Sequence, residues 1–399
     1  MRGGQGSWLI VLLVAVAAQP TLSYLLMGLG VPGGFTAGMV IGSIGVVIAL
    51  VLWVAQPLRW EWSRWEWVFL LGLLAVWAVT MGSSVLKGNV FTHIVAWLPI
   101  AVTMILLKRP SLPDVRRAVD AFGWVLVCGM AAFLLLELLG VIDHRVPVVS
   151  TEYELRTYWL PFSDLLDLPG RWAGPFAHPN LTSPVAAFLV VYGLARGGST
   201  RIAFVTAGVL VLLLTGTRSA MVAVLLGVLV LAVTQSGWLR SRRHVWMLAG
   251  ASAVALLGLV IGFLLTNPTL EGRTAMWPKF LSLWSQSPLT GVGDPGVTLA
   301  IQAEVIPSWA VHGHNVLVDP IVRYGIPAAL LVLLVLIAAA VVTIRGALTG
   351  SGVGLSILVT VVVCGALEST LDWRYLTVQM SILLVSVLLI DRRPAASEA

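Results

Sequence analysis

Long apolar segments follow one another along this chain and limit what it can fold into. A segment of about 20 apolar residues is long enough to cross a bilayer as an α-helix. About twelve such segments are present in the 399 residues, at 8–29, 35–55, 66–82, 89–107, 117–141, 181–195, 201–216, 218–235, 245–266, 324–344, 352–369 and 375–390. The sequence therefore predicts an all-α, polytopic membrane protein, with a single membrane domain over residues 1–399.

Composition agrees with lipid as the main solvent. Hydrophobic residues make up 58% of the chain and charged residues 11%, against roughly 45–50% and about 25% in soluble domains. No basic run carries interleaved aromatic residues, so we expect no nucleic-acid partner despite the net charge of +6. Cys128 and Cys364 lie in apolar segments, where packing thiols are expected rather than a disulfide or a metal cluster.

The distribution of positive charge predicts the orientation. If both termini are cytoplasmic, 15 of the 24 Lys and Arg residues lie in inner loops and 9 on the outer side. An excess of Lys and Arg on the inner side is typical of polytopic membrane proteins. The first apolar segment continues past Pro20, which favours an uncleaved helix over a signal peptide.

Two connections, at 142–180 and 267–322, are much longer than the others, and both are predicted on the outer face. Long ordered loops are usually functional. In the second loop, apolar residues recur at i, i+3, i+4 and i+7, namely at Trp277, Phe280, Leu281 and Trp284. This spacing predicts a short amphipathic helix along the outer membrane surface.

Unusual polar residues occur in and beside these loops. The first group is R-W-A-G-P-F-A-H-P-N at 171–180, in which Asn180 can cap the following helix, whereas Arg171 and His178 have no complete structural explanation. The second is T-G-T-R-S at 215–219, which forms the connection between two apolar segments. An arginine so close to hydrocarbon either extends to the interface or binds an anion, and we favour an anion for Arg218.

The second long loop holds two further groups. Arg273 starts the predicted amphipathic helix and can reach lipid headgroups. The loop ends in His312-Gly-His314-Asn315. No Cys, Asp or Glu cluster at ligand spacing joins the histidines, so a single histidine acting as a general base is a simpler interpretation than a metal site.

Arginines on one face can recognise several phosphate oxygens. A neutral histidine can take a proton from an attacking hydroxyl. Transfer of a glycan from a lipid diphosphate uses both, with His314 as the base and arginines stabilising the leaving diphosphate. This chemistry requires no metal and no cofactor.

Four segments in order resemble the O-antigen ligase and polymerase family. They are 171–180, 215–219, G-R-T-A-M-W at 272–277 with P-L-T-G-V-G at 288–293, and H-N at 314–315 followed, after nine intervening residues, by Gly325. Ala328 stands where the family's ligases usually carry another residue, which leaves ligase and polymerase both open.

The resemblance implies a GT-C-like helical fold and metal-independent, inverting transfer at the periplasmic face of a bacterial inner membrane. It implies His314 as the base and Arg218 and Arg273 as diphosphate ligands. The donor would be an undecaprenyl-diphosphate-linked glycan, and the acceptor lipid A-core or another lipid or protein acceptor of the cell envelope. Secondary site candidates are Arg171, His178, Asn180, His312 and Asn315.

Two alternatives are kept. A repeat-unit polymerase would use the same chemistry, and a transporter of an anionic substrate would instead carry charged groups at mid-depth in the membrane. Glu368 and Asp372 follow an apolar segment. They either orient an acceptor or, as we favour, form an ion pair at a helix end with Arg374.

Overall fold

The computed structural model describes residues 6–58, 61–87, 96–142, 145–146, 171–176, 178–236, 273–307, 312–349, 352–368 and 370–390. Its helices are α1 (Ser7–Gly28), α2 (Gly34–Val54), α3 (Arg64–Leu86), α4 (Trp97–Leu107), α5 (Leu112–Leu138), α7 (Pro179–Leu194), α8 (Gly198–Thr215), α9 (Arg218–Gln235), α11 (Arg273–Trp284), α12 (Gly293–Gln302), α13 (Val318–Thr349), α14 (Val353–Leu367) and α15 (Val378–Leu388). The one described strand pair is β1 (Arg145–Val146) with β2 (Arg171–Trp172), which are antiparallel.

The prediction of an all-helical membrane protein is confirmed. Within the described ranges, 7 helices are long and apolar enough to cross a membrane, namely α1, α2, α3, α5, α8, α9 and α13. Four shorter apolar helices, α4, α7, α14 and α15, lie at other predicted segments. The predicted segment 245–266 lies outside the described residues, and the total of twelve spans stays a prediction.

Local capping explains where several helices start. Ser63 precedes α3, and its hydroxyl accepts from the backbone N–H of Glu66, whose side chain in turn binds the Ser63 backbone N–H. This reciprocal arrangement satisfies two donors that a helix start leaves open. The Ser111 hydroxyl caps α5 by accepting from the backbone N–H of Asp114.

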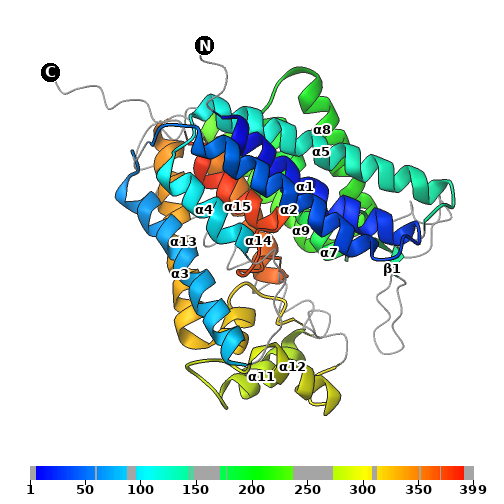
Figure 1. Ribbon diagram of the computed structural model, residues 1–399, viewed down its shortest axis with the longest axis vertical. Helices are drawn as coiled ribbons and strands as arrows, with labels where there is room; N and C mark the ends of the chain where they lie inside the picture. The colour runs from blue at the N-terminus through cyan, green and yellow to red at the C-terminus, as the bar shows by residue number, and fades with distance from the viewer. Residues whose placement is uncertain are drawn as a thin grey trace.

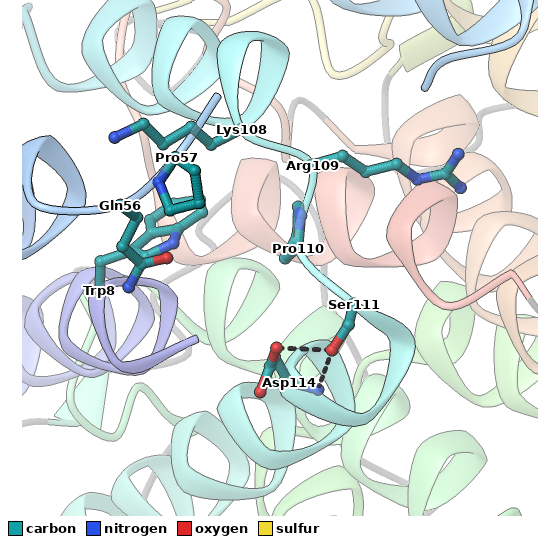
Figure 2. Close-up of a pocket in the computed structure, with 8 residues that line it drawn as sticks. All are labelled: Trp8, Gln56, Pro57, Lys108, Arg109, Pro110, Ser111 and Asp114. Atoms are coloured by element: carbon teal, nitrogen blue, oxygen red, sulfur yellow. Dashed lines mark hydrogen bonds between the residues drawn. The ribbon is translucent and has the colours of Figure 1, made fainter. Parts of the chain in front are cut away.

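Cationic side chains join several helices at one end of the bundle. Lys108, after α4, donates to the backbone carbonyls of Trp53 and Val54 at the end of α2. Arg109 pairs with Glu66 at 3.1 Å. A small pocket opens there between α1, α2, α4 and α5, as Figure 2 shows; its lining residues are Trp8, Gln56, Pro57, Lys108, Arg109, Pro110, Ser111 and Asp114.

Two helices, α7 and α15, are buried along almost their whole length. Around them, α1 packs on α2 and α5, α14 packs on α9 and α7, and α3 packs on α13 (Figure 1). Helices α8 and α14 end, and helices α7, α9 and α13 begin, at one end of the bundle. We call this end the site end. Figure 1 shows α11 and α12 at the bottom of the view, beyond the main bundle.

The described part of the second long connection contains the helices α11 and α12 and the start of α13. α11 and α12 pack together and against α13 around a small apolar core of Met276, Phe280, Leu283, Val297, Ala300, Ile306 and Val322. The predicted amphipathic helix is therefore present, but the residues that it buries are not the four that were expected to form its apolar face. Met276 and Leu283 are buried, and Leu281 is 41% exposed. The helix was expected to lie on lipid, whereas most of its apolar face covers its own chain.

α13 also starts earlier than the predicted 324, and Gly325 interrupts its helical geometry with φ 84° and ψ −177°. This backbone conformation is accessible essentially only to glycine. At this point the 288–293 segment approaches α13 backbone to backbone. The N–H of Ile326 donates to the Pro288 carbonyl at 2.9 Å, and the N–H of Val292 donates to the Val322 carbonyl at 2.8 Å.

Gly325→Ala is expected to be strongly destabilising, because a Cβ there would lie 2.2 Å from the Leu289 carbonyl oxygen. We expect the free energy of unfolding to fall by about 3 kcal/mol or more, from the strained φ and the collision together. Gly30→Ala is the matched control: φ is +71° and nothing lies within 4 Å of its Cβ position, so about 1 kcal/mol is expected. Denaturation in detergent measures both, and equal losses would contradict the backbone-docking explanation.

Candidate functional site

The turn between α8 and α9 is held by an arginine from another part of the chain. α8 ends at Thr215, Gly216 takes a left-handed conformation with φ 60°, and α9 begins at Arg218. The Arg171 guanidinium donates to the Thr215 carbonyl at 2.8 Å and to the Thr217 hydroxyl at 2.7 Å. The sequence left Arg171 unexplained, and the structure gives it the role of clamping this turn.

Arg171 is itself held firmly. It lies in β2, which pairs with β1 and so closes the ends of the first long connection. The neighbouring Trp172 is fully buried and its indole N–H donates to Glu137 at the end of α5. Arg171 also donates to the Asn180 side-chain oxygen at 2.8 Å, which joins the turn to the start of α7.

Arg218 is in a different situation. It is the first residue of α9, it is exposed, and within the described part of the chain it has no hydrogen bond or ion pair. The positive end of a helix dipole disfavours a cation at this position by about 0.3–1 kcal/mol. An anion bound at the turn would reverse this penalty, since the guanidinium and the helix N-terminus would then act together.

His178 is the N-cap of α7, so the predicted cap at Asn180 is wrong by two residues. His178 has an extended backbone, Pro179 follows at the first helical position, and the ring Nδ1 accepts from the Asn180 N–H at 3.1 Å. Burial, and then the nearby charge of Arg171, lower the pKa of His178 to about 4. The imidazole is therefore neutral near pH 7, as an acceptor cap requires.

His314 lies in a constrained loop beside a carboxylate. Its φ is 46°, which is uncommon for a residue other than glycine. Its Nδ1 is 3.0 Å from Oε2 of Glu368, which follows α14. The exposed fractions of the two side chains are 19% and 6%. A histidine that donates through Nδ1 has its lone pair on Nε2, the arrangement a general base needs.

Neighbouring contacts hold the His314 loop on both sides. The Asn315 side chain accepts from the Val318 N–H and donates to the Ala366 carbonyl at 2.8 Å, so it caps α13 and joins it to the end of α14. The Trp277 indole of α11 donates to the Gly313 carbonyl at 3.0 Å. Asn315 is thus a positioning group rather than a reactive one.

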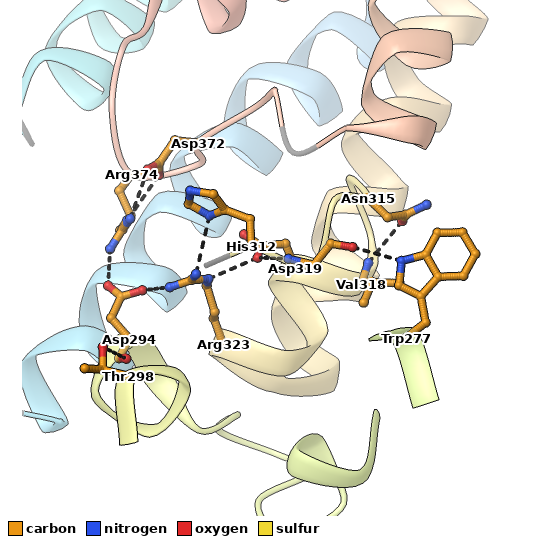
Figure 3. Close-up of polar contacts among 11 residues, drawn as sticks. Trp277, Asp294, Thr298, His312, Asn315, Val318, Asp319, Arg323, Asp372 and Arg374 are labelled. Atoms are coloured by element: carbon orange, nitrogen blue, oxygen red, sulfur yellow. Dashed lines mark hydrogen bonds and ion pairs between the residues drawn. The ribbon is translucent and has the colours of Figure 1, made fainter. Parts of the chain in front are cut away.

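Two other arginines near this loop are neutralised by aspartates, as Figure 3 shows. Arg323, which is 6% exposed, binds Asp319 and Asp294. Arg374 binds Asp294 and Asp372, so the expected pair between Arg374 and Asp372 is present. Burial disfavours ionisation of Asp372, but the charge and hydrogen bonds of Arg374 outweigh it and hold the pKa of Asp372 below its usual range.

His312 belongs to this charged group. Its Nδ1 is 3.4 Å from the Arg323 guanidinium. Among the described residues, no group of three or more His, Cys, Asp or Glu side chains is arranged to hold a metal ion.

The four predicted segments therefore come together near the site end, the third of them through the contact of Trp277 with Gly313. Arg171 contacts the residue before Arg218, while His178 lies within electrostatic range of Glu368, His314 and His312. The packing of α14 against both α9 and α7 brings these loops together. Arg273 begins α11, but its side chain is outside the described part of the structure.

The contact between Glu368 and His314 was missed by sequence reasoning, which expected Glu368 to orient an acceptor or to pair with Arg374. The two residues are 54 positions apart, and no spacing rule connects them. The available signal was the position of Glu368, because a carboxylate at the end of an apolar segment is energetically costly without a partner.

Comparison with known proteins finds one similarity, over part of the chain. Residues 202–333 match a family model described as O-Antigen ligase. The match covers about a third of the chain, so this region is similar to O-antigen ligases. The similarity supports a membrane enzyme of the ligase or polymerase type. No curated protein matches the chain.

The O-antigen ligase region includes Arg218, Arg273, His314 and Gly325. Arg171, His178 and Glu368 lie outside it and reach the same site through the contacts described above. The recognisable segments of the region thus cover only part of the site, and the rest comes from flanking helices.

The depressed pKa of His178 predicts a loss of stability in acid. The pKa of His178 is about 4 in the folded protein and 6.5 in the unfolded chain. The contribution of neutral His178 to the free energy of unfolding is therefore fully present above pH 6.5 and is lost as the pH falls toward 4. The loss is expected to reach roughly 2–3 kcal/mol. His178→Asn keeps a capping acceptor that does not titrate, and thermal midpoints of both proteins at pH 7 and pH 5 should show a smaller drop for the variant. An identical drop would contradict this role.

Proposed function

We propose that this protein is a metal-independent, inverting glycosyltransferase. It transfers a glycan from an undecaprenyl-diphosphate carrier to an acceptor in the cell envelope, lipid A-core being the acceptor that a ligase would use. The observation that supports this most directly is the gathering of an exposed arginine and a histidine–carboxylate pair at one end of a bundle that contains an O-antigen ligase region.

The donor diphosphate would bind at the start of α9. Arg218 supplies a guanidinium without a partner among the described residues, and the first backbone N–H groups of α9 supply further donors. Arg273 at the start of α11 is the second proposed ligand. As the bond from the anomeric carbon to the diphosphate breaks, charge grows on the leaving oxygens, and these cations stabilise it.

His314 would act as the general base. Its Nε2 takes the proton of the acceptor hydroxyl while the hydroxyl oxygen attacks the anomeric carbon from the face opposite the diphosphate, which inverts its configuration. Arg323 and Arg374 are less suited to donor binding, because carboxylates already neutralise them.

The positive-inside distribution supports a cytoplasmic location for both termini and a periplasmic location for the site end. The site end then faces the side of a bacterial inner membrane on which envelope glycans are assembled. A polymerase that extends repeat units would use the same groups, so the acceptor distinguishes the two activities.

Arg218→Ala is expected to weaken donor binding about 10- to 100-fold, as loss of hydrogen bonds to a charged group does. Binding to protein in nanodiscs is measured with undecaprenyl diphosphate, and with undecaprenol as the phosphate-free probe, whose binding should not change. Arg201→Ala is the matched control, since Arg201 is also exposed but lies at the opposite end of α8. Unchanged diphosphate binding by Arg218→Ala would rule out this diphosphate site.

His314→Ala is expected to lower the rate of transfer about 10²- to 10⁴-fold, with undecaprenyl diphosphate binding retained. The measurement is complementation of a deletion strain, followed by its glycolipid profile. Without a ligase, long carrier-linked polymer accumulates; without a polymerase, single repeat units remain. A His314→Ala gene that restores the full wild-type profile would exclude His314 as the base, and chelators are expected to leave transfer unchanged.

A further inference from the structure

We propose that Glu368 is a positioning residue for the reaction. It holds the His314 ring in one orientation and keeps its proton on Nδ1, so that the lone pair of Nε2 faces the acceptor hydroxyl. This inference rests on the proposed function and adds to it a residue outside the O-antigen ligase region.

The contact has the geometry of an orienting hydrogen bond. The Nδ1 to Oε2 distance is 3.0 Å, and the Glu368 side chain is 6% exposed. A buried carboxylate accepts and does not donate, so the nitrogen facing it must carry the proton. A hydrogen bond of this kind to one ring nitrogen holds a general-base histidine in a single tautomer, with the lone pair on the other nitrogen.

The backbones that carry the two side chains are joined to each other. The N–H of Val316 donates to the Gly365 carbonyl at 2.7 Å. Asn315 donates to the Ala366 carbonyl at 2.8 Å. We call these two bonds the α13–α14 seam. They lie within a few residues of His314 and of Glu368, so the distance between the imidazole and the carboxylate is set by the fold.

The backbone of Glu368 is also held in place. Its N–H donates to the Cys364 carbonyl and its own carbonyl accepts from the Thr370 N–H, both at 2.9 Å. On the other side, His314 adopts its left-handed φ of 46°. Strained backbone of this kind persists only where surrounding contacts require it, and here those contacts aim the ring at Glu368.

Asp372 shows what a structural carboxylate on the same connection looks like. It makes two bonds to the Arg374 guanidinium, whose own protonation does not change in proteins. Glu368 instead contacts a group that gains and loses a proton.

The proton balance of the step follows from this arrangement. The acceptor O–H proton moves to Nε2, the new bond from the anomeric carbon to the acceptor oxygen forms, and the diphosphate leaves with its electron pair. The imidazolium that results lies against the Glu368 carboxylate, and its Nε2 proton then passes to solvent.

The test compares Glu368→Gln, Glu368→Asp and the control Asp372→Asn in nanodiscs. Transfer is assayed with carrier-linked glycan and acceptor glycolipid extracted from the deletion strain. Glu368→Gln is expected to lower kcat about 10²- to 10⁴-fold and to change the donor KM by less than about threefold, because the diphosphate ligands are untouched. Glu368→Asp should recover part of kcat, and Asp372→Asn should keep kcat per folded molecule.

A spectroscopic measurement separates positioning from a loss of structure. Solid-state ¹⁵N NMR of histidine-labelled protein, with the His314 signal assigned by its absence in His314→Ala, reports which ring nitrogen carries the proton. Wild-type protein and Asp372→Asn should show the proton on Nδ1. Glu368→Gln should show a mixture or the opposite tautomer, because a glutamine amide can donate to Nδ1.

Two results would overturn the inference. The first is a kcat of Glu368→Gln equal to that of the wild type. The second is a reduced kcat of Glu368→Gln in which the His314 tautomer is unchanged. Either can occur while His314→Ala is inactive, in which case the proposed function stands and only the role of Glu368 fails. Full activity of His314→Ala would instead remove the general-base mechanism itself.

Discussion

The α13–α14 seam is the interaction on which the site depends. Two hydrogen bonds, from Val316 to Gly365 and from Asn315 to Ala366, join the start of one helix to the end of another. Because α14 also packs against α9 and α7, the seam sets the His314 loop relative to Arg218 and His178. Chemistry that needs a base and a cation at a fixed separation requires such a rigid connection.

Charge is arranged in two ways around this seam. Arg323 and Arg374 are enclosed by aspartates and link α12, α13 and the connection before α15. Breaking such buried pairs is costly, so they give the loops a fixed shape. Arg218 is placed against a helix dipole and exposed, which costs stability unless an anion arrives. The same residue type is thus enclosed by carboxylates in one place and left exposed in another, where we propose that it binds the donor.

Much of the helical layout could be predicted from sequence, and the contacts between loops could not. Apolar segment length located the spanning helices because hydrocarbon thickness sets a minimum length. The predicted start at 324 falls on a real break, because α13 consists of two helices joined at a kink at Gly325; the sequence missed the shorter helix before it, which begins after Asn315. Arg171, Arg218 and His314 could be singled out from the sequence, because polar residues of these types are unusual beside apolar segments. The partners of Arg171 and His314 were hidden, because Thr215 approaches Arg171, and Glu368 approaches His314, only through helix packing.

The short β1–β2 pair has a consequence for how this chain can vary. It closes the ends of a long connection and, with the Trp172 anchor on α5, keeps Arg171 on the α8–α9 turn. Closing a longer loop costs little entropy, about 0.6 kcal/mol for each doubling of its length. Insertions and replacements between β1 and β2 can therefore accumulate without displacing the clamp, so this part of the sequence is free to diversify while Arg171 stays on the turn before α9.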